Sequence, residues 1–465
     1  MLNWRKPLLV PALQAIRPVT AHELALLRRL DRAPAAEVAR VHEERLERLL
    51  RHAHDTTDYY RDVLSTCGVV RGGKVDLGRF ERIPILTREI IREQGARLRA
   101  RTLPPGRKAF ANRTGGSTGE PIQYWQDSHY WDINVATKLY HFEMLGKALG
   151  EPELKVWGSD RDIVIETGTL KRRSENFLYH RRIMACGKLD EAEVEGIVAE
   201  LNRFRPKTLW GYVDGLYTIA QHVNRTGCRI HRPAAVITAG GTLLPPMREA
   251  IGRAFRTPVV NLYGSREMGD MACECPEMAG LHLSCNSHRV EVLDEAGRSV
   301  VDEDGDLIVT SLHNHAMPFI RYRIGDRGCL SSVPCPCGRP HQLLKSVSGR
   351  GMEAFLRRDG AVISPIYLIT AVGGLVEPTL VRRVQFVQKD HERVVVKLVK
   401  AEGADPAALE RHCERIRAKL RTVMGATCEV RFEQVGDIPR TASGKYLYTV
   451  SEVAAGRPGL ARFSA

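Results

Sequence analysis

The sequence predicts an α/β fold in which a large N-terminal α/β domain with a parallel sheet precedes a small mobile α+β domain. Strand-like and helical segments alternate between residues 188 and 263, as in parallel sheets with crossover helices. After residue 349 the pattern changes to two long strand-like segments, one helix and another strand. We therefore expect a large N-terminal domain over 1–349, with a cysteine-bearing segment at 273–341, and a small C-terminal domain over 350–465.

A long amphipathic helix is the first element that the pattern predicts, over residues 36–53. Its apolar residues fall at 38, 41, 46, 49 and 50, close to helical spacing, and charges occupy the remaining face. A stripe of this kind usually docks onto a core. We favour that interpretation over a membrane-binding or calmodulin-binding role.

The central segment predicts helices at 189–203 and 215–224 around a short strand near 206–211. A strand at 235–238, a helix at 245–255 and a strand at 258–263 follow. Ligands of such sheets bind beyond the carboxyl ends of the strands. Because 239–241 and 263–265 lie at two such ends, we expect them to line one pocket.

The C-terminal segment predicts strands at 383–387, 393–399 and 428–432 and a helix at 406–423. Glycines and charges at 349–353 form a linker that allows rotation between the two parts.

A loop of glycines and hydroxyls, Thr-Gly-Gly-Ser-Thr-Gly-Glu-Pro, occupies residues 114–121. Backbone amides and short hydroxyl donors of this kind can surround a polyphosphate. The loop is not the Walker A motif, because no Gly-Lys-Ser/Thr closes it at the required spacing.

The composition, 43% hydrophobic and 27% charged residues, is that of a globular protein. A chain of 465 residues is long enough for one large core and a smaller domain. No apolar run is long enough for a membrane span, and the first residues lack a signal-peptide core, so a cytoplasmic location is expected. The net charge of +14 fits anionic ligands or simply an arginine-rich composition. A basic nucleic-acid-binding protein is an alternative, although no such motif is present.

Cysteine and histidine are concentrated in two short segments, since six of the eleven cysteines fall between 273 and 337. Without a secretory signal they are expected to be reduced. A structural zinc site needs four thiolate or imidazole ligands. We predict that Cys275, His282, Cys335 and Cys337 bind zinc and pin the two segments together. The alternative is that these cysteines are small buried side chains.

Five motifs follow one another along the chain: 114–121, Asn-Leu-Tyr-Gly-Ser-Arg-Glu at 261–267, Arg-Tyr-Arg-Ile-Gly-Asp at 321–326, Gly-Arg at 349–350 and Pro-Arg-Thr-Ala-Ser-Gly-Lys at 439–445. In this order they resemble the adenylate-forming ligases, which join a carboxylate to AMP and then to a thiol or amine. Residues 54–61, 273–285 and Cys-Pro-Cys-Gly-Arg at 335–339 resemble its phenylacetate-CoA ligase branch and the CapK-like relatives.

The resemblance implies ATP, magnesium and coenzyme A as ligands and a role for each motif. Tyr263 would stack on adenine, Asp326 would bind the ribose hydroxyls, and Glu267 would hold magnesium. The catalytic residues would be Lys445, which reaches the α-phosphate and the carboxylate, with Glu267 and Arg266. The implied contacts to ATP or AMP are Thr114, Gly116, Ser117, Thr118, Gly119, Ala239, Gly240, Gly241, Tyr263, Gly264, Ser265, Asp326 and Arg350.

The acid is expected between Trp210, Gly211, Tyr212, the 239–241 strand end and Tyr263. Aromatic walls favour an aryl or other mostly apolar acid.

Four positions depart from the pattern of the family. Gly115 replaces a serine and Glu120 a lysine, which removes a hydroxyl and a positive charge from the phosphate loop. Arg266 replaces a threonine or serine that touches the α-phosphate, and Glu353 replaces the aspartate at the hinge.

The leading hypothesis is activation of an organic acid as acyl-AMP, followed by transfer to coenzyme A. Alternatively, the acyl group passes to an amine, a hydroxyl or a carrier-protein thiol. The third hypothesis is a zinc-stabilised protein that binds nucleic acid, which leaves the five ordered motifs unexplained. Association of N-terminal domains into a homodimer is compatible with the sequence.

Overall fold

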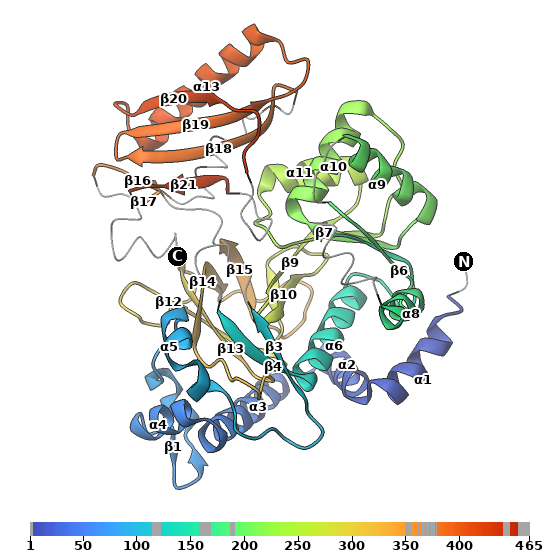
Figure 1. The fold of residues 1–465 in the computed structure, drawn as a ribbon, viewed down its shortest axis with the longest axis vertical. Coiled ribbons are helices and arrows are strands. Elements are labelled where there is room, and N and C mark those ends of the chain that lie inside the picture. Colours follow the sequence, from blue (N-terminus) through green and yellow to red (C-terminus); the bar gives the residue numbers. More distant parts are fainter. Residues whose placement is uncertain are drawn as a thin grey trace.

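An eleven-stranded mixed sheet forms the centre of the molecule in a computed structural model (Figure 1). The structure describes residues 3–113, 122–157, 169–186, 191–348, 379–439 and 447–453, and, within 355–377, residues 355–359, 362, 363, 368, 372 and 377. The strand order is β12-β13-β14-β15-β11-β10-β9-β8-β7-β5-β6.

Five neighbouring strands of this sheet are parallel. They are β6 (Arg181–Met184), β5 (Glu153–Val156), β7 (Thr208–Tyr212), β8 (Ala235–Ala239) and β9 (Val259–Ser265). Helices α9 (Glu191–Phe204), α10 (Val213–Thr226) and α11 (Pro245–Phe255) connect them. The strand and helix alternation predicted between 191 and 263 is confirmed.

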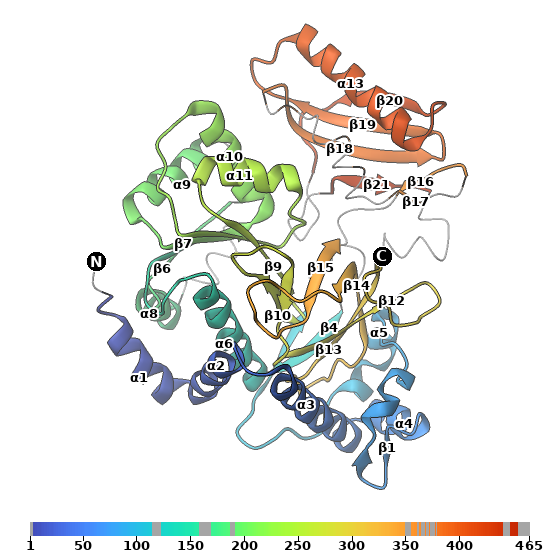
Figure 2. The ribbon, with the colours of Figure 1, turned by 180° about the vertical axis from the view of Figure 1, so that it is seen from behind.

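The two faces of the parallel strands are covered by different helices (Figures 1 and 2). Leu209 and Val236 pack with apolar residues of α9, α10 and α11. Trp210 and Ile237 pack with Phe142 of α6 (Ser128–Met144) on the other face. Alternating side chains along each strand therefore bury both faces, as expected for a parallel sheet.

The remaining six strands are antiparallel, so the expectation of a parallel sheet holds only for part of it. Only residues 266–268 separate β9 from β10, which is too short for a crossover helix. The antiparallel strands are β10 (Gly269–Glu274), β11 (Leu281–Leu283), β12 (His288–Leu293), β13 (Gly305–Ser311), β14 (Tyr322–Ser331) and β15 (Leu343–Ser348).

Three of the N-terminal helices pack against this antiparallel part, whereas the first two helices pack against α6. The predicted helix is α3 (Ala35–Thr56), and its apolar stripe, including Leu46, Leu49 and Leu50, is buried in the main core. Core docking of this helix is therefore confirmed. The other N-terminal elements are α1 (Lys6–Ile16), α2 (Pro18–Leu30), α4 (Asp58–Thr66), β1 (Val70–Arg71), β2 (Lys74–Val75), the 3-10 helix Leu77–Arg82, α5 (Arg88–Leu98), β3 (Ala109–Arg113), β4 (Gln123–Asp127) and α8 (Leu170–Leu178).

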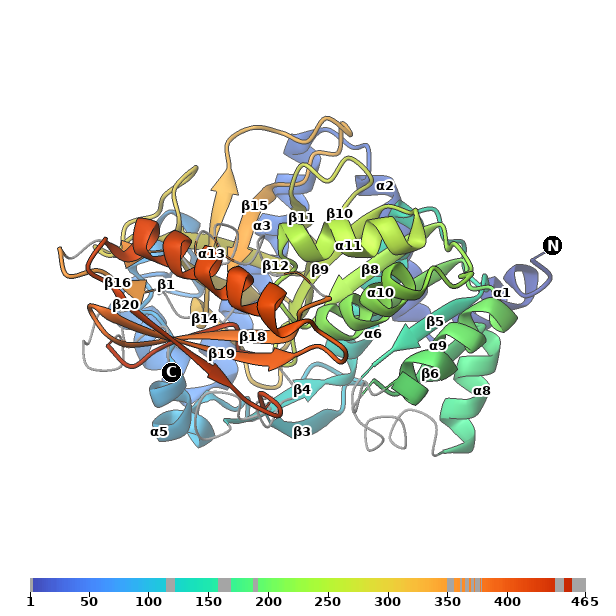
Figure 3. The ribbon, with the colours of Figure 1, turned by 90° about the horizontal axis from the view of Figure 1, so that it is seen from above.

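The C-terminal part has its own sheet, in the order β20-β19-β18-β21, covered by one helix (Figure 3). Its elements are β16 (Phe355–Leu356), β17 (Val362–Ile363), β18 (Val381–Asp390), β19 (Arg393–Lys400), α13 (Pro406–Met424), β20 (Glu429–Gln434) and β21 (Thr449–Ser451). The α+β class predicted for it is confirmed. The boundary at 349/350 lies outside the described residues and stays a prediction, as does the mobility of the domain.

None of the described helices is long and apolar enough to cross a membrane.

Histidines with lowered pKa values gather where α3, α6 and the segment after β13 meet. The His52 and His315 rings lie 4.6 Å apart, and the His129 and His313 rings 6.0 Å apart. Burial, reinforced by Arg107, lowers the pKa of His315 to about 2. Burial also lowers the pKa of His52, His129 and His313. In the folded protein these imidazoles are therefore harder to protonate than in the unfolded chain.

We expect acid to destabilise the fold through these histidines. A folded-state pKa below the unfolded value means that protons bind the unfolded chain more tightly, so stability is complete above pH 6.5 and falls as the pH drops below it. Each histidine contributes a slope of up to about 1.4 kcal/mol per pH unit. Urea unfolding between pH 7.5 and 4.5 measures this slope, and His315→Asn should reduce it. An equal slope in wild type and variant would contradict the assignment.

Candidate active site and metal centre

The carboxyl ends of the parallel strands bring an aromatic cluster together. Trp157 follows β5 and stacks on Tyr212 at the end of β7, with ring centroids 4.1 Å apart and planes inclined by 26°. Trp210 lies 5.1 Å from Trp157, also between ring centroids. Of the three, Trp210 is 3% exposed, whereas Trp157 and Tyr212 are half-buried. Trp157 and Tyr212 therefore form the accessible part of the cluster, and Trp210 supports it from behind.

Gly240, which follows β8, lies directly against this cluster. A Cβ at Gly240 would stand 2.4 Å from two ring atoms of Tyr212, and its φ of +72° is strained for other residues. Gly211 likewise has no room for a Cβ, which would lie 2.4 Å from the carbonyl oxygen of Val156. The ring of Tyr212 thus lies directly against Gly240. Gly241 is next in the chain, and Ala239 is buried.

Two lysines flank the aromatic cluster. The ammonium of Lys155 lies 4.7 Å from the ring centroid of Trp157 and 4.8 Å from that of Trp210. The ammonium of Lys138 lies 5.0 Å from the Trp210 centroid and 3.5 Å from a carboxylate oxygen of Asp270. Cations at such distances are attracted by the π-faces. The cluster is therefore electropositive as well as apolar.

Tyr263 on β9 and Asp326 on β14 contact each other directly. The hydroxyl of Tyr263 donates a hydrogen bond of 2.7 Å to the Asp326 carboxylate. Burial, with the charge of Asp326 second, raises the pKa of Tyr263 well above its ordinary value. The structure thus joins the residue expected at the adenine with the one expected at the ribose, although 63 positions separate them.

Glu267 occupies the short turn between β9 and β10 and is 6% exposed. Burial raises the pKa of its carboxyl group, and the charge of Asp326 adds to this, while Arg88 and hydrogen bonds from Ser265 and the Glu267 amide oppose it. The backbone of this turn is held in place: the Gln126 amide donates to the carbonyl oxygens of Arg266 and Glu267, at 3.2 and 3.1 Å.

Gly264 and Ser265 shape the same turn. A Cβ at Gly264 would lie 2.4 Å from the carbonyl oxygen of Gly269, so only glycine permits the close pairing of β9 and β10. The Met268 amide donates to the Ser265 hydroxyl at 3.1 Å. The Arg266 side chain is exposed.

The hairpin of β3 and β4 connects the predicted phosphate loop to Glu267. Residues 114–121 join these two strands, whose last pair is Arg113 and Gln123. Gln126, which holds the Glu267 turn, lies three residues further along β4. The strands that flank the predicted phosphate loop in the sequence therefore pack against the Glu267 turn.

Several predicted site residues lie outside the described residues: Thr114, Gly115, Gly116, Ser117, Thr118, Gly119, Glu120, Arg350, Glu353 and Lys445. Tyr448, three residues after Lys445, donates a hydrogen bond of 3.1 Å to Asp214 in the first turn of α10. This contact joins the C-terminal sheet to the parallel part of the large sheet.

Two residues of this region were missed by the sequence reasoning. Arg88, at the start of α5, acts electrostatically on Glu267, and its Nε donates to the Tyr322 hydroxyl at 3.4 Å. Trp157 follows a short buried strand. An aromatic residue at the end of a strand was the signal by which Trp157 could have been identified as a site residue.

The four predicted zinc ligands converge. The ligand atoms of Cys275, His282, Cys335 and Cys337 all lie within 4.8 Å of one another. Cys275 and Cys335 are 3.6 Å apart between sulfurs, and the Cys337 sulfur is 3.5 Å from Nε2 of His282. The sulfurs are too far apart for a disulfide and are arranged around a common point, as four ligands of zinc would be.

Helix α2 ends against the group of Cys275, His282, Cys335 and Cys337. Arg339 donates to Asp31 at 2.6 Å, and Arg32 donates to the Cys337 carbonyl oxygen at 2.7 Å. Cys275 and Cys335 also pack in the same apolar cluster as Trp210. The four residues thus connect the end of β10, β11 and the loop 332–342 with the core behind the aromatic cluster.

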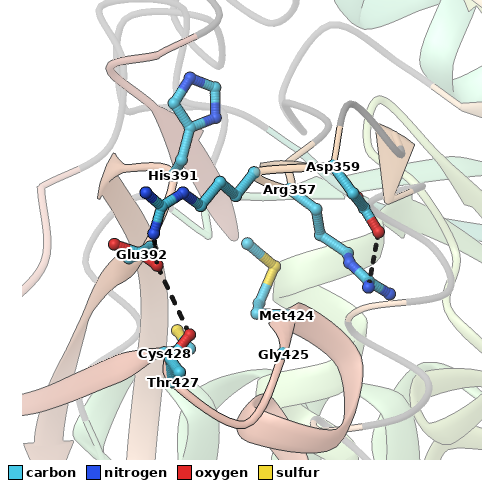
Figure 4. Close-up of a pocket in the computed structure, with 9 residues that line it drawn as sticks. Arg357, Asp359, His391, Glu392, Met424, Gly425, Thr427 and Cys428 are labelled. Carbon is cyan, nitrogen blue, oxygen red and sulfur yellow. Dashed lines mark hydrogen bonds and ion pairs between the residues drawn. The ribbon is translucent and has the colours of Figure 1, made fainter.

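A cavity of about 310 Å³ lies in the C-terminal part (Figure 4). Its charges pair with each other, Arg357 with Asp359 and Arg358 with Glu392, each at 2.7 Å. None of the predicted site residues that the structure describes lines it.

The comparisons with known proteins point to one group of relatives. Residues 355–452 match the model of the CapK C-terminal domain. Protein CapK of Staphylococcus aureus is 24% identical over 88% of both chains, and the phenylacetate-coenzyme A ligase of Thermus thermophilus is 23% identical over 90% of this chain and 97% of its own.

A solved structure shares the fold over nearly the whole chain. The 2-hydroxyisobutyryl-CoA ligase in the postadenylation state matches with a TM-score of 0.73 and 19% identity, over 91% of this chain and 92% of its own. In the thioesterification state the same ligase matches with a TM-score of 0.58 over the same shares.

Proposed function

Because the chain belongs to the phenylacetate-CoA ligase and CapK-like branch of the adenylate-forming superfamily, we propose that it activates a carboxylic acid with ATP and transfers the acyl group to coenzyme A. The observation that carries the proposal is the meeting of Tyr263, Asp326 and the Glu267 turn at the edge where the parallel strands end. The strands that precede and follow the phosphate loop in the sequence, β3 and β4, form the hairpin that holds this turn through Gln126.

The first half-reaction places the ATP along this edge. The acid carboxylate attacks the α-phosphate and pyrophosphate leaves, so the protein contributes positioning and neutralisation of charge. Tyr263 would contact the adenine and Asp326 the ribose hydroxyls, and their mutual hydrogen bond orients both. Ser117, Thr118 and the neighbouring amides would hold the outer phosphates, and Lys445 would reach the α-phosphate.

Magnesium fits the surroundings of Glu267. Its buried carboxylate lies near enough to Asp326 for the two negative charges to interact, and hard oxygen ligands are those that magnesium prefers. Bound there, the ion would neutralise charge on the departing phosphates. Gln126 and Tyr130 keep the turn in position, because both donate to the Glu267 carbonyl oxygen.

Zinc fits the four ligands Cys275, His282, Cys335 and Cys337, whose number, type and spacing are those of a structural site. A bound ion would join the end of β10, β11 and the loop 332–342. Since Cys275 and Trp210 share one apolar cluster, the metal would also keep the support of the aromatic cluster in place.

The acid would lie against Trp157 and Tyr212, whose accessible stacked rings favour an aryl or other mostly apolar acid. For the second half-reaction, the C-terminal domain would rotate and release the contact between Tyr448 and Asp214. The higher TM-score to the postadenylation state supports placing the present arrangement in the first half-reaction.

We expect acid-dependent release of pyrophosphate from ATP and magnesium. A panel of aryl and aliphatic acids, each measured with and without coenzyme A, tests both halves of the proposal. A rate that rises further with coenzyme A identifies a CoA ligase, whereas a rise with an amine or a carrier protein identifies another acceptor. Glu267→Gln, which removes the magnesium ligand, is the inactive control. If no acid in the panel releases pyrophosphate, adenylation of this acid class is refuted.

A further inference from the structure

Helices α1 and α8 leave a group of large apolar side chains in solvent. We call it the α1–α8 face, and it consists of Trp4, Leu8, Val10, Ile16, Leu170, Phe177 and Leu178. Ile16 is 74% exposed and Leu170 is 82% exposed. Seven of the twelve large apolar side chains that are exposed among the described residues thus belong to these two helices and the turn before α1. Clusters of this kind mark interaction surfaces.

Both helices are fixed to the molecule and to each other. Leu9 and Leu13 of α1 are buried in an apolar cluster that includes Tyr179. The Arg5 guanidinium lies 4.4 Å from the Trp4 ring centroid and 5.2 Å from that of Phe177. Figures 1 and 3 show both helices at the edge of the molecule, on the side away from the C-terminal sheet. The exposed side chains are therefore a stable feature of the surface.

Positive charge predominates in the segments that carry the α1–α8 face. Residues 3–17 and 170–182 contain eight basic residues and a single acidic one, Glu175, a net charge of +7. Three of the basic residues pair with acids of other segments, Arg17 with Asp132, Arg181 with Glu153 and Arg182 with Glu200, which leaves about +4. Lys6, Arg172 and Arg173 are exposed beside the apolar residues. Aromatic and aliphatic side chains among lysines and arginines are the composition of helices that lie in an anionic lipid interface.

We propose that the α1–α8 face binds the surface of an anionic lipid bilayer. Its apolar side chains would enter the boundary between headgroups and acyl chains, and its basic side chains would contact the lipid phosphates. Helix α1 has 11 residues, too few to span a bilayer, so it would lie in the plane of the interface. A nucleic acid would use the positive charge but not the apolar side chains. Binding of the bilayer is independent of the proposed adenylation.

Flotation of the full chain with vesicles tests the proposal. We expect binding to phosphatidylcholine vesicles that contain phosphatidylglycerol, little binding to phosphatidylcholine alone, and weaker binding in high salt. Burial of one large apolar side chain in the bilayer strengthens binding about tenfold or more. L8S combined with F177S should therefore weaken partitioning into the vesicles about 100-fold. Lys6→Gln should weaken it about fivefold.

Val333→Ser is the matched control, because Val333 is 67% exposed but lies between β14 and β15, outside the α1–α8 face. It should bind vesicles like the wild type. Thermal unfolding of each variant shows whether it is folded. The salt dependence of vesicle binding by the wild-type protein provides a second test that needs no substitution. Absence of binding to anionic vesicles, or equal binding by the double variant, would overturn the proposal. So would a dimer in sedimentation velocity that L8S with F177S dissociates, since the face would then join two copies of the chain.

Discussion

Lys445→Ala is expected to lower acid-dependent pyrophosphate release by roughly 100-fold to 1000-fold, the usual cost of removing one group that stabilises charge in a transition state. The lysine would lie at the α-phosphate only during adenylation, because the C-terminal domain that carries it leaves for the second half-reaction. Transfer of the acyl group from preformed acyl-AMP to coenzyme A should therefore change little. The two half-reactions are measured separately, by pyrophosphate release and by thioester formation.

The control is Lys419→Ala, which removes an exposed lysine of α13 in the same domain. It should leave both half-reactions unchanged. If Lys445→Ala slowed both half-reactions equally, the role assigned to Lys445 would be wrong, and a general defect of the domain would explain the loss.

Replacing Cys335 and Cys337 with serine should remove the bound zinc and destabilise the large domain. A ligand present at a thousand times its dissociation constant stabilises the folded state by about 4 kcal/mol. With an unfolding entropy of about 2.1 cal/mol/K per residue over roughly 350 residues, this loss predicts a fall of roughly 5 °C in the midpoint. Elemental analysis of the purified protein gives the metal content, and calorimetry gives the midpoint.

Cys228→Ser is the control for the metal site, because Cys228 is a free cysteine outside the four ligands. It should keep the metal and shift the midpoint little. A wild-type protein without zinc would refute the metal site while leaving the adenylation proposal intact.

Local patterns allowed a large part of the fold to be predicted. We predicted helices α9, α10 and α11 and the strands between them correctly. Buried side chains recur with the period of a helix or of a strand, and this period can be seen in the sequence. The convergence of Cys275, His282, Cys335 and Cys337 was also predicted, because soft ligands are rare and were concentrated in two short segments. The antiparallel strands were missed, since short apolar segments do not reveal their partners.

The sequence by itself determined which chemical groups are available: the order of the five motifs, the alternation of strands and helices, and the four soft ligands. Only the tertiary structure decided which of these groups meet. The hydrogen bond between Tyr263 and Asp326, the ring of Tyr212 against Gly240 and the charge of Arg88 near Glu267 all join distant parts of the chain. The physical reason is that periodicity is set by neighbours in the chain, whereas these contacts depend on strand order and on packing of the whole sheet.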